Sequence, residues 1–214
     1  MPILQTRALS SLPRSAAVAF ILGAAQLANA QSPSTPPAAK PASVPSANDR
    51  MLERGPEDQL LAKRKGTWNV VMTMQPAPDA KPIVVKGIIA ERTMVGLYLQ
   101  ETMRPADARL PDFKRFAYLT YNKVEARWQY TSMDTRAPIG IMFAKSYGQQ
   151  PASELTLHFE GFALPGFGPE VEGRFLRARH VVSWESETRD VTRQYWTAVG
   201  GQEWLAVQYE FTRR

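Results

Sequence analysis

Cysteine is absent from this 214-residue sequence, and histidine occurs only twice. Without cysteine the chain forms no disulfide, no thiolate zinc site, no iron–sulfur cluster and no thiol nucleophile. Two histidines offer few ligands, so we expect no metal site. The P-loop, a G-x-G-x-x-G segment opening a helix, the G-x-S-x-G elbow and H-E-x-x-H are missing too. Nucleotide-dependent enzymes and zinc hydrolases are therefore disfavoured.

Negative charge is in the minority. The 26 Lys and Arg residues outnumber the 20 Asp and Glu residues, for a formal net charge of +6. A basic protein invites comparison with nucleic-acid-binding proteins. However, Arg7 and Arg14 precede an N-terminal apolar run and residues 31–55 add one net positive charge, so residues 56–214 carry only +3. No run of five like charges remains to follow a phosphate backbone, so we expect no nucleic-acid partner.

The first 30 residues have the order of a secretory signal peptide. Arg7 and Arg14 precede the apolar run at 16–25, and the small-residue triplet Ala-Asn-Ala follows at 28–30. The apolar run is much shorter than the ~20 residues that span a bilayer. The pattern predicts cleavage after Ala30 and a periplasmic or secreted protein with no transmembrane segment after cleavage. An uncleaved membrane anchor is the alternative.

Residues 31–55 are predicted to be a disordered tether. Between residues 31 and 50, 13 of 20 residues are Pro, Ser or Ala. Such a segment buries too little apolar surface to offset its ordering entropy.

A short helix and a series of strands are predicted for residues 56–214. The segment 57–65 has acidic residues first and basic residues last, with Pro56 before it and Gly66 after it, as expected of a helix. Beyond Gly66 the apolar residues alternate with a period of two, which is typical of half-buried strands. After a first strand at 67–74, the predicted strands are 83–93, 97–104, 113–121, 127–133, 139–147, 154–160, 173–185, 188–197 and 203–213.

About ten short strands at hairpin spacing indicate an all-β domain. The segments between them carry turn residues such as Pro, Gly and Asn, and no long helical pattern follows Gly66. We expect one up-and-down antiparallel β-barrel over residues 56–214, because closure removes exposed strand edges. A two-sheet β-sandwich is the alternative.

The segment Gly66-Thr67-Trp68, after a short helix and at the start of the first strand, resembles the Gly-x-Trp signature of lipocalins and other calycin-type barrels. In those proteins the Trp closes one barrel end and an Arg of the last strand lies across it. The resemblance implies that Arg213 or Arg214 stacks on Trp68.

A wider resemblance covers nearly all of residues 56–214. The segments GPEDQLLAKRKGTWNV, FAYLTYNKVEARWQYTSMD, LTLHFEG and WLAVQYEFTRR are similar to an uncharacterised bacterial family, domain of unknown function 1579, which is thought to be lipocalin-like. This family carries no established catalytic residues. The resemblance therefore implies a lipocalin-like fold and leaves the function open.

Aromatic residues are the first candidates for a ligand site. All five tryptophans, at 68, 128, 184, 196 and 204, fall within predicted strands. Alternation places the members of each of three rows on one face: Trp128, Tyr130 and Ser132; His180, Val182 and Trp184; Leu205, Val207, Tyr209 and Phe211. Such rows suit either an apolar ligand pocket or a barrel filled by its own side chains.

Glu101 shares its parity with Leu97, Leu99 and Met103, so simple alternation points it inward. A buried carboxylate needs a partner, a proton or a wet cavity. We expect a register shift or bulge to turn Glu101 outward. The alternative is a ligand-binding or general acid/base group.

The two histidines are expected to face opposite ways. His180 points inward beside Trp184, where we expect it to satisfy a core hydrogen bond. It could instead hydrogen-bond a ligand or ligate haem iron, as one related calycin-type barrel does. His158 alternates against Leu157 and Phe159 and is expected to face solvent.

Two loops complete the candidates. Asp134 and Arg136 flank a turn at a strand end, where we expect a turn-stabilising contact and, alternatively, a ligand contact by Arg136. The apolar segment 162–169, FALPGFGP, is expected to form an exposed loop. That loop suits a lid, a partner-binding patch, or simple packing on the barrel end.

These observations favour an exported protein that binds a small, mostly apolar ligand in a barrel lumen. The candidate ligand-binding residues are Trp68, Glu101, Trp128, Tyr130, Arg136, His180, Trp184 and Tyr209. One alternative is an enzyme on the same barrel, with Glu101 or His180 as general acid/base on a lipid-like or phenolic substrate. Another is an envelope protein that docks a partner through residues 162–169. No cofactor is expected beyond the haem alternative.

Overall fold

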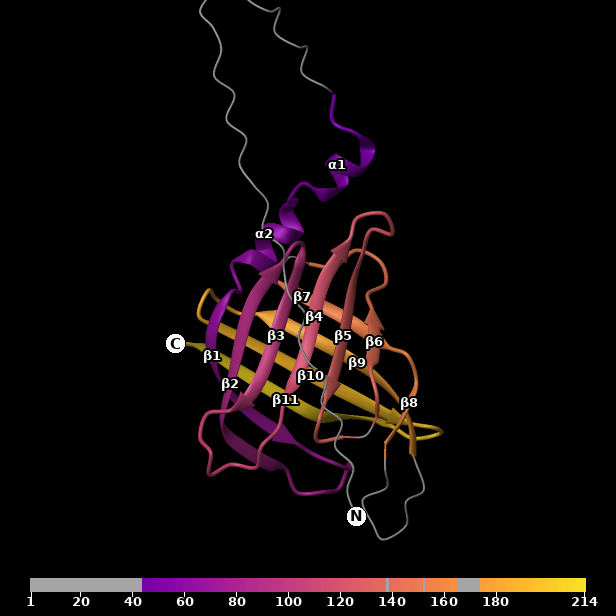
Figure 1. The fold of residues 1–214 in the computed structure, drawn as a ribbon. Helices are drawn as coiled ribbons and strands as arrows, with labels where there is room; N and C mark the ends of the chain where they lie inside the picture. The colour runs from indigo at the N-terminus through magenta and orange to yellow at the C-terminus, as the bar shows by residue number, and fades with distance from the viewer. Residues whose placement is uncertain (1–43, 138, 152, 165–173) are drawn as a thin grey trace, which may run out of the picture. The chain divides into compact units, whose positions relative to one another are not determined.

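The computed structural model describes residues 44–137, 139–151, 153–164 and 174–214. The predicted signal peptide at 1–30 and most of the predicted tether lie outside them. The described helices are α1 (Ala47–Leu52) and α2 (Pro56–Ala62). The described strands are β1 (Gly66–Met74), β2 (Ile83–Val95), β3 (Tyr98–Pro105), β4 (Arg115–Asn122), β5 (Arg127–Asp134), β6 (Met142–Lys145), β7 (Glu154–Phe159), β8 (Phe162–Leu164), β9 (Arg174–Trp184), β10 (Arg189–Ala198) and β11 (Glu203–Arg213), as Figure 1 shows.

Ten strands close into one antiparallel barrel. The pairing runs from β1 through β2, β3, β4, β5, β6 and β7 to β9, continues through β10 and β11, and returns to β1. Each barrel strand therefore has a hydrogen-bonded neighbour on both edges. This closure confirms the predicted all-β barrel and shows that the two-sheet sandwich is wrong.

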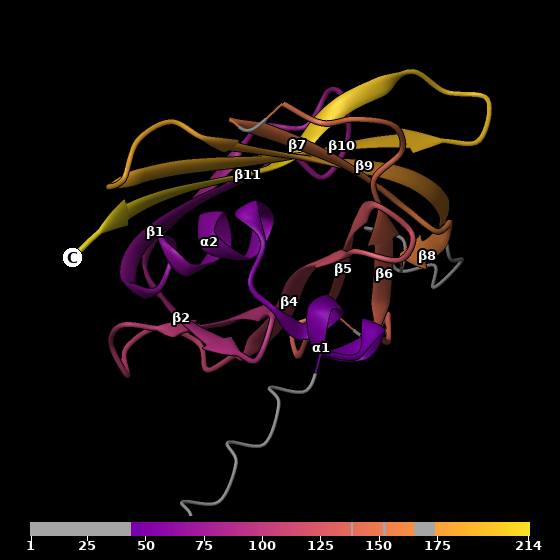
Figure 2. The ribbon, with the colours of Figure 1, turned by 90° about the horizontal axis from the view of Figure 1, so that it is seen from above.

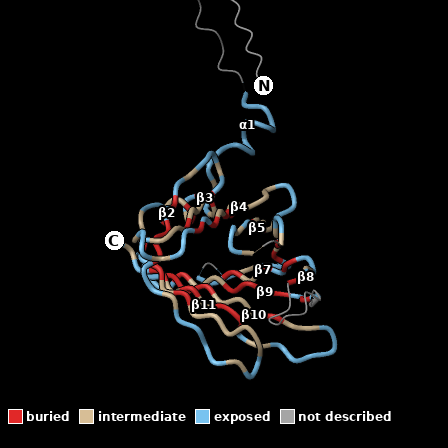
Figure 3. The backbone as a smooth tube through the Cα atoms, turned by 60° about the horizontal axis from the view of Figure 1, so that its bottom comes forward, coloured by how far each residue is buried: buried red, intermediate tan, exposed pale blue. Residues whose placement is uncertain are grey.

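The barrel follows the alternation of the sequence closely. On β5 the residues Trp128, Tyr130 and Ser132 are buried while those between them are half-buried, and β4 shows the same alternation. Each predicted strand has a counterpart, with ends that differ by up to three residues. Figure 3 shows that buried positions recur along β9, β10 and β11.

The short strand β8 was not predicted. β7 and β8 pair with successive parts of the same edge of β9, so they resemble one strand with a break. Gly161 lies in that break, where a Cβ atom would come within 2.3 Å of the Phe175 ring. Only glycine leaves this ring in place. Residues 162–164 of the expected loop FALPGFGP thus form a strand, and residues 165–169 lie outside the described residues.

Both helices are short and begin with local caps. Ser46 and Asp49 form a reciprocal capping box at α1, within the segment predicted to be a tether. Composition did not reveal α1, because its stability depends on these two residues rather than on burial. α2 begins at Pro56, one residue before the predicted start, and ends at Ala62, three residues before the predicted end. Seen from above in Figure 2, α2 lies within the outline of the strands.

The hydrophobic core lies inside the barrel, at the end that α2 covers. Leu61 of α2 and Trp68 of β1 are fully buried, and aromatic and aliphatic residues from all the barrel strands pack with them. One predicted row is broken: Leu205 is partly exposed, whereas Val207, Tyr209 and Phe211 are buried. A bulge in the β10–β11 pairing skips Ala206 and turns Leu205 to the other face.

Candidate functional site

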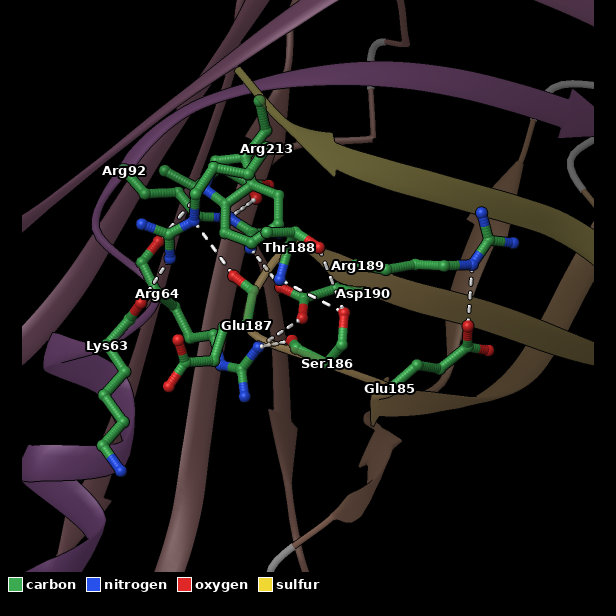
Figure 4. A network of polar contacts seen from close by, with 12 residues as sticks. Lys63, Arg64, Arg92, Glu185, Ser186, Glu187, Thr188, Arg189, Asp190 and Arg213 are labelled. Carbon is green, nitrogen blue, oxygen red and sulfur yellow. Dashed lines mark hydrogen bonds and ion pairs between the residues drawn. The ribbon is translucent and has the colours of Figure 1, made fainter.

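A chain of buried ion pairs crosses the barrel interior near α2. Asp190 of β10 is its centre: Arg64 Nη1 donates to Oδ1 at 2.8 Å, and Arg92 Nη1 donates to Oδ2 at 2.5 Å. The Asp190 side chain is 1% exposed and both arginine side chains are 8% exposed. Figure 4 shows the two guanidinium groups approaching this carboxylate. Such pairs hold their partners in place because breaking them leaves a buried charge.

The ion-pair chain continues through Glu101. Arg92 Nε donates to Glu101 Oε2 at 2.7 Å, and Arg115 Nη1 donates to Oε1 at 3.1 Å. Glu101 therefore points inward, and the bulge expected to turn it outward is not found in its pairing with β2 and β4. Its two arginine partners compensate for the burial of the carboxyl group inside the barrel.

Arg115 connects the ion pairs to an aromatic group. Its Nη2 donates to Tyr130 Oη, and its guanidinium lies 5.4 Å from the centre of the Tyr209 ring. Burial alone would lower the pKa of Arg115, but the surrounding Tyr130, Tyr209 and Glu101 groups raise it above its ordinary value. Burial also raises the pKa of Tyr130, against the effect of Arg115. Arg115 is thus charged and Tyr130 neutral at physiological pH.

Trp68 closes the barrel end, as the Gly-x-Trp resemblance implied. Its ring lies between two guanidinium groups, at 4.7 Å from Arg213 and 4.8 Å from Arg92, and its Nε1 donates to the Arg64 carbonyl at 3.2 Å. Arg213, rather than Arg214, takes the predicted place. Gly66 precedes the indole with a φ of 125°, which favours glycine. Trp68 therefore has a structural role and lines none of the described cavities.

A small inner cavity of about 50 Å³ lies beside the ion pairs. Its polar lining includes Arg92, Glu101, Arg115, Tyr130 and His180. The predicted row of His180, Val182 and Trp184 faces it, and Tyr209 and Phe211 border it from β11. The sequence-predicted residues Glu101, Tyr130, His180, Trp184 and Tyr209 thus share one cavity.

His180 differs from the expected core histidine. It is 2% exposed, and neither ring nitrogen has a hydrogen-bond partner among the described residues. The ring stacks on Phe159 at 5.7 Å and meets the edge of Tyr130 at 5.2 Å. Burial, followed by the nearby Arg115 charge, lowers the pKa of His180 to about 3. The ring is neutral at physiological pH, with one N–H and one acceptor nitrogen facing no partner.

Haem does not fit beside His180. Ligand pockets for molecules of drug size occupy roughly 300–1,000 Å³, whereas the cavity at His180 measures about 50 Å³. The exposed His158 lies outside the barrel, as predicted. Among the described residues, no group of three or more His, Cys, Asp or Glu side chains is placed to hold a metal ion.

A larger outer cavity of about 420 Å³ lies at the other end of the lumen. Its lining is mainly apolar, with four methionines from β1, β5 and β6 and aromatic rings from β8, β10 and β11. Polar groups occur at a few points on its wall. The apolar lining residues include Met72, Met74, Met133, Met142, Phe162, Trp196, Val207 and Tyr209, and the polar ones are Arg115, Ser132, Asp134, Arg136 and Gln194.

Asp134 and Arg136 border the outer cavity. Arg136 Nη2 donates to Asp134 Oδ2 at 2.6 Å, and the Arg136 backbone N–H donates to Oδ1 at 3.0 Å, as expected of a turn-stabilising contact. Arg136 also lies 4.0 Å from the Phe113 ring centre. Burial would raise the pKa of Asp134, but the hydrogen bonds from Arg136 lower it. Arg136 thus stabilises the turn and also lines the cavity.

A third hollow of about 600 Å³ lies at the surface between α2, the β4–β5 hairpin and the segment after β6. Trp128 borders it, together with exposed polar residues such as Gln59 and Gln149. This hollow is larger than the outer cavity, but about half of its wall is polar, which suits an apolar ligand less well. Trp128 itself packs against Trp184 at 6.0 Å.

Sequence reasoning missed the arginines and aspartate of the ion-pair chain. Arg115 shares its parity with Ala117 and Leu119 on β4, so the argument applied to Glu101 would also have placed it inside. Asp190 shares parity with Thr192 in the same way. Arg64 follows a short helix and carries no such pattern, so only the fold brings it to Asp190.

Comparisons with known proteins identify a family. The family model described as "Protein of unknown function (DUF1579)" matches residues 53–213. No curated protein matches the chain. Among solved structures, the crystal structure of Rv2717c from M. tuberculosis is similar, with 14% identity, a TM-score of 0.48, and coverage of 76% of this chain and 99% of that one. Within the described residues, no helix has the length and hydropathy required to cross a membrane.

Proposed function

The chain belongs to the DUF1579 family of proteins of unknown function, and we propose that it is an exported protein that binds a small, mostly apolar molecule in its barrel. The observation that carries the proposal is the outer cavity of about 420 Å³. Its volume falls within the roughly 300–1,000 Å³ that is typical of small-molecule sites. A barrel filled by its own side chains would leave no such space.

The lining of the outer cavity supports an apolar ligand. Met72, Met74 and Met142 contribute flexible thioether side chains, which adapt to ligands of irregular shape. Trp196 and Tyr209 contribute flat apolar surfaces. We propose that Arg136 and Tyr209, both predicted from the sequence, contact the ligand. Export rests on residues 1–30, whose order of charged, apolar and small residues is typical of a signal peptide.

Native mass spectrometry tests the proposal without a guess at the ligand. The mature protein is purified from the periplasm of its own organism and examined intact. We expect a co-purifying small molecule of a few hundred daltons, lost on denaturation.

A blocking variant locates the ligand. Met142 lines the outer cavity, whereas Phe143, the next residue of β6, is 50% exposed. We expect Met142→Trp to weaken binding of a neutral fluorescent probe, N-phenyl-1-naphthylamine, at least tenfold, because the indole fills the cavity. Phe143→Trp adds the same ring outside and keeps the affinity of the native chain. Equal affinities in both folded variants, or no probe binding by the native chain, would refute lumen binding.

A further inference from the structure

The buried ion pairs contain one more positive charge than negative. Arg64, Arg92 and Arg115 are shared between two carboxylates, Asp190 and Glu101. All three arginine side chains are at most 8% exposed. An unpaired buried charge is unfavourable unless a counter-charge reaches it.

Neighbouring charged groups do not supply this counter-charge. Asp134, which borders the outer cavity, accepts two hydrogen bonds from the Arg136 guanidinium. The two charges of this pair cancel, so Asp134 does not balance the excess charge. Asp58 pairs with Lys123 at 3.0 Å at α2. Among the described residues that line the inner cavity, Glu101 is the only carboxylate, and it faces two arginines.

Two residues that line the inner cavity have hydrogen-bond donors without partners. Arg115 donates to Glu101, Tyr130 and the Met103 sulfur among the described residues, which leaves two of its five N–H groups without an acceptor. His180, 2% exposed and lining the same cavity, has no partner at either nitrogen there. Because buried polar groups are almost always hydrogen-bonded, these donors indicate that another molecule or ion binds in the cavity.

The size of the inner cavity limits the occupant. About 50 Å³ accommodates a group of a few atoms, since a water molecule fills about 30 Å³ in the liquid. Water would satisfy the donors but would not neutralise the excess charge. The depressed pKa of His180, to which Arg115 contributes, is a further sign of a positive potential here.

We propose that the inner cavity binds one monovalent anionic group of a few atoms, held by free N–H groups of Arg115 and a ring N–H of His180. The group is either a free ion or the acidic end of a molecule in the outer cavity, because Arg115 and Tyr209 line both cavities. The proposal does not depend on the proposed function.

Bromide is the probe for this site. Crystals of the protein grown in potassium bromide are measured at the bromine absorption edge. We expect an anomalous peak in the inner cavity, within hydrogen-bond distance of His180 and Arg115. No peak there in well-diffracting crystals overturns the proposal.

Melting temperature gives a second measurement, in solution. Potassium bromide is compared with potassium gluconate, whose anion is too large for the cavity, at equal ionic strength. At about ten times the dissociation constant of bromide, we expect the native chain to melt roughly 3–6 °C higher than in gluconate. Equal melting in both salts overturns the proposal.

Histidine variants assign the effect to the inner cavity. His180→Phe removes the N–H and fills the space, so the rise in melting temperature from gluconate to bromide should disappear. His158→Phe, the matched change at the exposed histidine, should keep it. If His180→Phe does not fold, His180→Leu replaces it, and the crystallographic measurement needs no variant. If a folded His180 variant melts as much higher in bromide as the native chain does, bromide does not bind in the inner cavity.

A pair of ligands distinguishes the two sources of the anion. Decanoate and decanol have the same chain and differ in charge. If decanoate displaces bromide and decanol does not, the site takes the acidic end of the apolar ligand. If bromide remains with both, the site takes a free ion. Failure of both to bind counts against the proposed function and leaves the bromide result standing.

Discussion

Asp190 is the residue on which the buried ion pairs most depend, and Asp190→Asn tests this directly. The substitution keeps the size of the side chain and removes its charge. Arg64 and Arg92 then lose a shared counter-ion, at distances that are now 2.8 Å and 2.5 Å. Both guanidinium groups stay buried because Arg92 packs on the Trp68 ring and Arg64 lies over the Trp184 ring.

The magnitude follows from burial. Removing one partner of a buried ion pair destabilises a protein by about 3–5 kcal/mol. Arg92 keeps Glu101, and Arg64 keeps the Ser186 carbonyl at 2.6 Å, so we expect the lower half of this range. For a domain of this size, a loss of 3–4 kcal/mol lowers the melting temperature by roughly 6–16 °C.

Urea unfolding followed by tryptophan fluorescence measures the loss. Glu210→Gln is the matched control, because Glu210 pairs with Arg189 at 2.9 Å with side chains 35% and 47% exposed. Exposed pairs contribute about 0–1 kcal/mol. If Asp190→Asn lowered the free energy of unfolding by no more than this control does, the ion pairs would not stabilise the barrel, and the reasoning would be refuted.

Three further predictions concern His180, the barrel end and the leader. The folded pKa of His180 is about 3 against 6.5 for the free side chain, so the unfolded chain binds the extra proton between these values. In gluconate buffer the free energy of unfolding should therefore fall as pH drops from 6.5, by up to about 1.4 kcal/mol per pH unit. Urea titrations of His180→Phe should show a smaller dependence of this free energy on pH. The same pH dependence in both proteins would contradict the buried neutral ring. Arg213→Ala should destabilise the fold by about 1–2 kcal/mol through loss of the Trp68 contact, whereas Arg214→Ala should change it by less than about 0.5 kcal/mol; equal effects in thermal melts would disprove the specific stacking. Intact mass of the exported protein should lack residues 1–30, and a full-length mass would favour the uncleaved anchor.

Much of the fold was predictable because strands impose a period of two on the sequence. Wherever a strand is half-buried, that period decides which side chains face the core, as for Trp128, Tyr130 and Ser132. The prediction failed where a bulge changes the phase, as at Leu205, or where a strand is too short for a pattern, as in β8. Capping made α1 a helix in a segment whose composition indicated a tether.

The site was predictable only in part. Alternation placed His180 and Trp184 on one inner face correctly, yet it could not show that Glu101 finds two arginines inside. Those arginines come from β2 and β4, and Arg64 joins Asp190 across 126 positions of sequence. Contacts of this range are decided by closure of the barrel, not by any local signal.

The sequence by itself determined the element types, the order of the strands along the chain, and the inward rows of aromatic residues. These depend on local propensity and periodicity, which act over a few residues. Only the tertiary structure decided that Glu101 meets two arginines inside the barrel, that the lumen keeps about 420 Å³ open at one end, and that His180 has no hydrogen-bond partner within the described chain. The physical reason is that cavities and buried charges depend on how side chains from distant strands share one interior.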